Sequence, residues 1–87
     1  MQVFYVRAEP LAEPGVEATA FVVANDPDEA LLLLRKDFNF SGYRLPPIEM
    51  TALDASRISV REAFGDTAPT EKGVYGFVGK QAPAGAP

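Results

Sequence analysis

The sequence predicts an α+β domain in which three or four strands form an antiparallel or mixed sheet and one long helix packs on one face. Two observations carry this: β-type segments rich in Val, Phe and Tyr lie near both ends of the chain, and a capped, leucine-rich segment lies between them. A length of 87 residues indicates a single domain. We expect the order ββαβ(α)β over residues 1–80, followed at 81–87 by a disordered tail of Gln, Ala, Pro and Gly.

The first two strands are predicted to form an antiparallel hairpin. Gln2 to Ala8 is rich in β-branched and aromatic residues, and Glu17 to Ala24 follows as a second strand. Pro10 and the pair Pro14-Gly15 separate them and favour a turn, because Pro presets a turn conformation and Gly tolerates a positive φ. A short connection between neighbouring strands most simply gives antiparallel pairing.

The long helix has a well-marked beginning. Asp26 is placed to accept from exposed N–H groups, Pro27 suits the first helical position, and Glu29 completes a capping-box spacing. We predict a helix from Pro27 to about Asn39, with Gly42 as a stop signal just beyond it.

The remaining elements are shorter. Alternation over 48–53 predicts a third strand, and the run 73–78 predicts a last strand whose glycines indicate a bulge or a close backbone approach. Between them, Ser59 and Glu62 have capping-box spacing and favour a short helix over 59–64, although Ile58 and Val60 alternate as in a strand.

Four consecutive leucines in the helix cannot all face one core. Projection at about 100° per residue places Leu32 on the outer side, between Arg35 and Lys36. A single exposed leucine is common and needs no function, but Leu32 is also a candidate for a partner surface in a homodimer. The residues predicted to face inward are Ala30, Leu31, Leu33, Leu34 and Phe38.

The first strand is apolar on both of its faces. Val3 and Tyr5 project to one face, and Phe4 and Val6 to the other. Because one helix covers only one side of a sheet, the second face is expected to pack against another subunit, the short helix or the tail. A homodimer formed through the sheet or its edge is therefore a hypothesis.

The loop Gly42 to Pro47 is the most distinctive connection. Its two prolines hold the backbone extended and display Tyr43 and Arg44, residue types favoured at interface hot spots. The run Arg-Leu-Pro-Pro is also a fragment of a polyproline ligand for SH3-type domains. The alternative is a rigid crossover from helix to strand with Tyr43 packed under it.

Composition and charge argue against several kinds of partner, cofactor and location. The net charge is −4 and the basic residues are scattered, which disfavours nucleic acid and anionic membranes as partners. No His or Cys occurs, so we expect no disulfide, zinc site or other cofactor. The longest aliphatic run is 30–34, far below the roughly 20 residues of a membrane span. The first residues are strand-like and no secretory signal is recognised, which predicts a cytoplasmic protein.

These observations favour a non-enzymatic protein–protein interaction module, with a homodimer or another protein as the partner. No catalytic residue is predicted. The predicted partner-binding residues are Leu32, Tyr43, Arg44 and Tyr5.

The alternative is a small domain that binds an anionic ligand or acts as an enzyme through arginine and tyrosine. Arginine guanidinium groups bind carboxylates and phosphates in a forked geometry. A third possibility, an acidic mimic of nucleic acid, is disfavoured by the small net charge. The set that would form the ligand site is Arg7, Arg44, Arg57 and Arg61 with Tyr5, Tyr43 and Tyr75.

Overall fold

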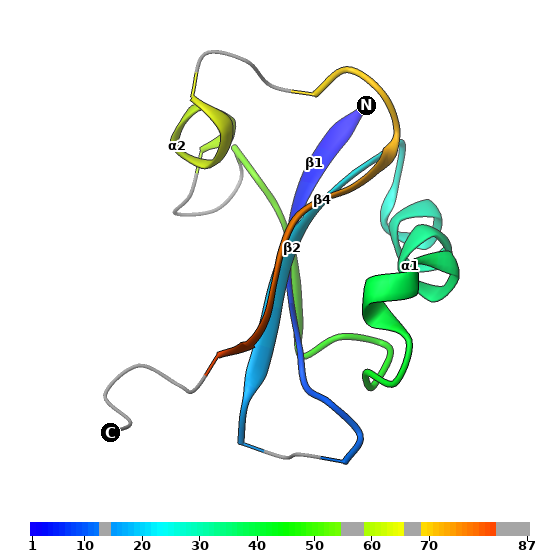
Figure 1. Ribbon diagram of the computed structural model, residues 1–87. Helices are drawn as coiled ribbons and strands as arrows, with labels where there is room; N and C mark the ends of the chain where they lie inside the picture. The colour runs from blue at the N-terminus through cyan, green and yellow to red at the C-terminus, as the bar shows by residue number, and fades with distance from the viewer. Residues whose placement is uncertain (13–14, 55–58, 66–68, 82–87) are drawn as a thin grey trace.

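A computed structural model describes residues 1–12, 15–54, 59–65 and 69–81. Four antiparallel strands form one sheet in the order β3-β1-β2-β4, with the long helix on one face and the short helix toward the other (Figure 1). The predicted α+β class and the single long helix are confirmed. The elements are β1 (Gln2–Ala8), β2 (Glu17–Ala24), α1 (Pro27–Lys36), the 3-10 turn η1 (Phe38–Phe40), β3 (Glu49–Ala52), α2 (Val60–Phe64) and β4 (Gly73–Gln81).

The central hairpin has the predicted bounds and pairing. β1 and β2 run antiparallel, with Gln2 opposite Ala24 and Ala8 opposite Ala18. Phe4 and Val6 are buried on the α1 side, whereas Tyr5 is half-buried on the other face. The strand is therefore apolar on both faces, as its composition predicts.

The predicted start of α1 is confirmed in detail. The N–H of Glu29 donates to the Asp26 carboxylate at 2.8 Å, and the Glu29 carboxylate accepts from the N–H of Asn25 at 2.7 Å. Lys72, just before β4, adds a bond to Glu29 at 3.1 Å. The Asn25 N–H and then the Lys72 ammonium hold the pKa of Glu29 below its ordinary value, because both stabilise the ionised carboxylate.

The predicted end of the helix is wrong. α1 ends at Lys36 and not near Asn39, because Asp37 is extended (φ −81°, ψ 131°) and its carboxylate accepts from the N–H of Asn39 at 2.8 Å to begin η1. This break removes Phe38 from the helical phase. Phe38 was expected inside and is 89% exposed, while Phe40 enters the core in its place.

The core lies between α1 and the sheet. Leu34 and Ala30 of α1 are fully buried, and Leu31 and Leu33 are half-buried beside them. The small alanines of β2 allow the helix to approach the sheet closely. The buried cluster consists of Phe4, Val6, Ala8, Ala20, Val22, Ala24, Ala30, Leu34 and Phe40.

The glycines of β4 mark two bulges, as their positions in the sequence predict. Phe21, Thr19 and Glu17 of β2 pair with Tyr75, Val78 and Gln81 of β4, so each two-residue step on β2 meets a three-residue step on β4. Gly76 takes a positive φ of 63° at the first bulge. Bulges of this kind discourage uncontrolled pairing at an edge strand. β4 also extends beyond the predicted 73–78, whereas β3 is shorter than the predicted 48–53.

The short helix α2 is present with both bonds of the predicted capping box. The N–H of Ser59 donates to Glu62 at 3.0 Å, and the N–H of Glu62 donates to Ser59 Oγ at 3.2 Å. Its Phe64 ring lies 5.0 Å from that of Phe21, so α2 covers part of the second face of the sheet. Among the described residues, the helices are too short and polar for any of them to cross a membrane. Gln81, predicted as the first residue of a disordered tail, is the last residue of β4. Residues 82–87 lie outside the described part, so the predicted tail there stays a prediction.

Candidate functional site

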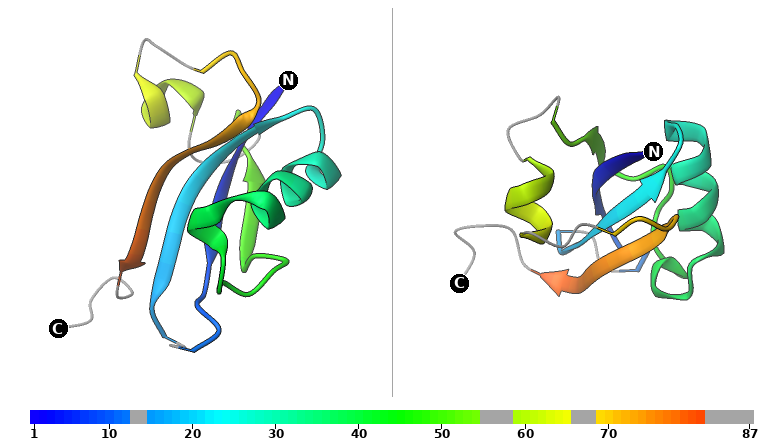
Figure 2. Two further views of the ribbon diagram at one scale, coloured as in Figure 1. Left: turned by 45° about the vertical axis from the view of Figure 1, so that its right-hand side comes forward. Right: turned by 90° about the horizontal axis from the view of Figure 1, so that it is seen from above.

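The outer side of α1 carries an apolar side chain surrounded by charge. Leu32 is 50% exposed, as its helical phase predicts, and Asp28, Arg35 and Lys36 are exposed around it. Turning the molecule brings α1 in front of the sheet with this side toward the viewer (Figure 2, left). Within the described parts of the chain, Asp28, Arg35 and Lys36 form no ion pair.

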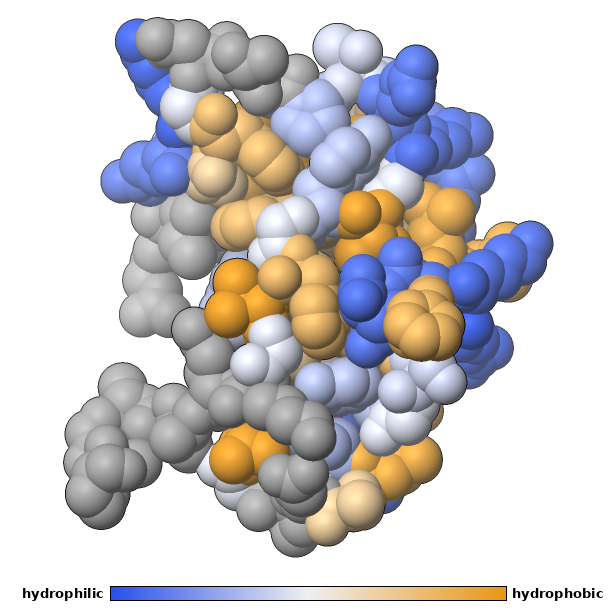
Figure 3. All heavy atoms as spheres, viewed as in Figure 1, coloured by the Kyte–Doolittle hydropathy of each residue, from blue (hydrophilic) through white to orange (hydrophobic). Residues whose placement is uncertain are grey.

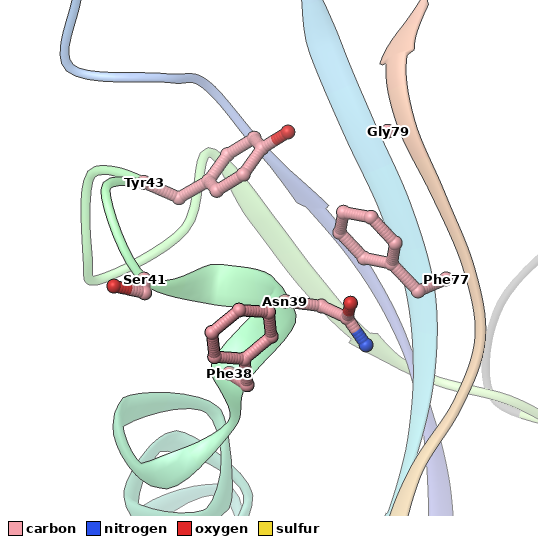
Figure 4. A pocket seen from close by; sticks show the side chains of 6 residues that line it. All are labelled: Phe38, Asn39, Ser41, Tyr43, Phe77 and Gly79. Atoms are coloured by element: carbon pink, nitrogen blue, oxygen red, sulfur yellow. The ribbon is translucent and has the colours of Figure 1, made fainter.

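A hollow of about 510 Å³ lies between η1 and β4. Tyr43 and Phe77 extend toward one another from its two sides, with Phe38 at the rim (Figure 4). Their ring centroids are 6.0 Å apart in an edge-to-face arrangement, and Phe40 contacts both rings from the core. The lining consists of Phe38, Asn39, Ser41, Tyr43, Phe77 and Gly79.

The chemistry of this hollow suits binding of an uncharged group. Three aromatic rings are combined with neutral polar groups, and none of the described lining residues carries a charge. A side chain at Gly79 would change the shape of the hollow, because its Cβ would lie 2.9 Å from the Phe77 ring and 3.2 Å from the Tyr43 hydroxyl and would push these side chains aside. In the space-filling view, apolar residues gather near the centre of the face, with charged residues toward the α1 side (Figure 3).

The loop that carries Tyr43 and Arg44 is fixed to the end of β1. The N–H of Arg44 donates to the carbonyl of Glu9 at 2.8 Å, and the N–H of Leu11 donates to that of Gly42 at 3.0 Å. Tyr43 packs on Phe40, which agrees with the rigid-crossover alternative for this loop. The Arg44 side chain is exposed, and its guanidinium lies as far as 4.0 Å from the Glu9 carboxylate. An exposed and long ion pair of this kind contributes little to stability.

Tyr5 lies apart from the other predicted partner-binding residues. Its ring is 5.7 Å from Phe21 on the face of the sheet opposite α1, whereas Tyr43 belongs to the α1 side. Phe21 also contacts Phe64, and Phe64 contacts Tyr75. Together with Tyr5, these rings form a row of four across that face. The four predicted residues therefore do not form one surface.

The predicted arginine and tyrosine ligand site is not assembled in the described residues. Arg7 lies between two carboxylates, 3.1 Å from Glu17 and 3.3 Å from Glu49, so its charge is already compensated. Arg44 is near Glu9, and Arg61 is on α2. Arg57 falls outside the described residues. No group of His, Cys, Asp or Glu in the described segments is arranged to hold a metal ion.

Comparison with models of known protein families, with curated proteins and with solved structures finds no match. The functional conclusion therefore depends on the surfaces of this chain. Sequence reasoning missed Phe38 and Phe77 as surface-forming residues. One pattern in the sequence could have predicted that Phe38 is exposed. Asp37 and Asn39 follow the last basic residues of the helix, and such side chains can end a helix and begin a new turn.

Proposed function

We propose that this protein is a non-enzymatic protein–protein interaction module that associates with itself. The observation that carries the proposal is the exposure of Leu32 and Phe38 on the helical side of the molecule. Leu32 lies on the outer side of α1, and Phe38, two residues after the end of α1, lines the aromatic hollow.

Apolar surface left in water favours association. Removing it from solvent contributes about 25 cal/mol per Å², and apolar patches on small domains mark interaction sites. Phe38 is 89% exposed and lines the same hollow as Tyr43 and Phe77, so this region offers apolar surface to a partner. Tyr43 and Phe77 are held by core contacts, so little side-chain freedom is lost when a partner covers them.

A cytoplasmic location is part of this proposal, and a chain without cysteine is compatible with a reducing compartment because it needs no disulfide. The alternative, a ligand-binding or enzymatic domain using arginine and tyrosine, has no supporting contact among the described residues. Arg7, its most central member, is bound by two acids.

Sedimentation equilibrium of the purified chain tests the proposal. Between about 10 and 500 µM, a range suited to a small interface, the average mass should rise from 9.4 kDa toward twice that value. Phe38→Ser should reduce the rise, whereas Ile48→Ser, at an exposed site before β3, should not. A 9.4 kDa species at every concentration would contradict self-association.

A further inference from the structure

We propose that two copies of this chain meet through the outer sides of their α1 helices, antiparallel, with Leu32 at the two-fold axis. This inference rests on the proposed self-association and specifies its partner and geometry. It is carried by the outer stripe of α1, defined as Asp28, Leu32, Arg35 and Lys36, all of which are exposed.

Charge is arranged with opposite signs on either side of Leu32. Asp28 lies four residues before it and Lys36 four residues after it, so all three lie along one side of the helix. Arg35, three residues after Leu32, adds a second cation to the same end. The stripe is thus acidic at its start, apolar at its centre and basic at its end.

These charges have no partner within their own helix. Asp28 and Lys36 are eight residues apart, which is about 12 Å along an α-helix and too far for contact. The neighbouring acid, Glu29, is already bonded to the Asn25 N–H and the Lys72 ammonium. In the described part of the chain the stripe therefore keeps unpaired charges of both signs.

A second copy complements this pattern only in one direction. When two helices run antiparallel with Leu32 against the partner's Leu32, Lys36 faces the partner's Asp28, and Asp28 faces the partner's Lys36. A parallel arrangement would place like charges together. A two-fold interface makes both contacts equivalent, so one substitution changes the interface twice.

The size of the outer side of α1 determines how tightly the dimer is expected to form. α1 has ten residues, so it is about 15 Å long and presents a small contact area. Phe38, two residues beyond the end of α1, is exposed as well but lies outside this stripe, on η1. Interfaces at the low end of the size range are reversible and weak. We therefore expect a dimer that forms at micromolar concentrations or above.

Charge reversal in two separate variants tests the geometry. Asp28→Lys makes the stripe basic at both ends, and Lys36→Asp makes its two terminal positions acidic. Each variant alone should dimerise at least about tenfold more weakly than the wild type at about 50 mM salt, where charges are little screened. Mixed together, the two variants should form a heterodimer, because each basic position then faces an acid.

The double variant Asp28→Lys/Lys36→Asp is the matched control. It carries both substitutions and any local cost to the helix, yet restores opposite charges in the antiparallel arrangement, so it should dimerise like the wild type. Circular dichroism should confirm that all variants fold. If the wild type dimerises and neither single reversal weakens it, or if mixing and the double variant restore nothing, the proposed interface is wrong while self-association stands. A wild type that stays monomeric would overturn both.

Discussion

The two sides of α1 differ in what they contact, although each is built around a leucine. On the inner side Leu34 is fully buried against the sheet, together with Ala30. On the outer side Leu32, only two residues away, is 50% exposed between charges that lack partners among the described residues. The inner side of α1 therefore stabilises the fold, whereas its outer side remains exposed.

The largest expected effect is on the inner side. Leu34→Ala should lower the free energy of unfolding by roughly 2–5 kcal/mol, because it removes buried apolar contacts and leaves a cavity. Urea unfolding followed by circular dichroism measures this change. Leu32→Ala is the matched control and should change the same free energy by less than about 0.5 kcal/mol. Equal losses for the two substitutions would show that the two sides of α1 are not distinct.

A smaller effect is expected on the pKa of Glu29, one of two acids at the start of the helix. Glu29 fastens α1 to Asn25 and Lys72, whereas Asp28 has no such bond among the described residues. Because the pKa of Glu29 is lowered in the folded state, its contribution to stability is present at neutral pH and is lost as the pH falls through that lowered pKa.

Carbon-13 NMR titration of the side-chain carboxyl group measures this pKa directly. Lys72→Met should raise the Glu29 pKa part of the way toward its ordinary value, since the Asn25 N–H, the larger cause, remains. Asp28→Asn, as a control, should leave the Glu29 titration close to that of the wild type. A Glu29 pKa at its ordinary value in the wild type would contradict the observed contacts.

The fold was largely predictable because its signals are local. Asp26 and Pro27 determine where α1 begins, and the β-branched and aromatic residues of Gln2–Ala8 predict β1. The end of α1 was not predicted, because the helical spacing of Leu34 and Phe38 outweighed the capping signal at Asp37. The structure shows that a side chain able to begin a new turn ends the helix even where apolar spacing continues.

The candidate surfaces were predictable only in part. The exposure of Leu32 follows from helical phase alone. The hollow does not, because it joins Tyr43 to Phe77, residues 34 positions apart that meet only when β4 pairs with β2. Tyr5 was grouped with Tyr43 by residue type, and only the sheet topology places them on opposite faces.

Sedimentation equilibrium of Leu32→Asp beside Ile48→Asp tests the account most directly. The two leucine-sized side chains are equally exposed, at 50%, and each substitution adds one negative charge. Leu32→Asp should remain a 9.4 kDa monomer at concentrations where Ile48→Asp and the wild type dimerise. Dimerisation of Leu32→Asp to the same extent as Ile48→Asp would contradict the assignment of association to the outer side of α1.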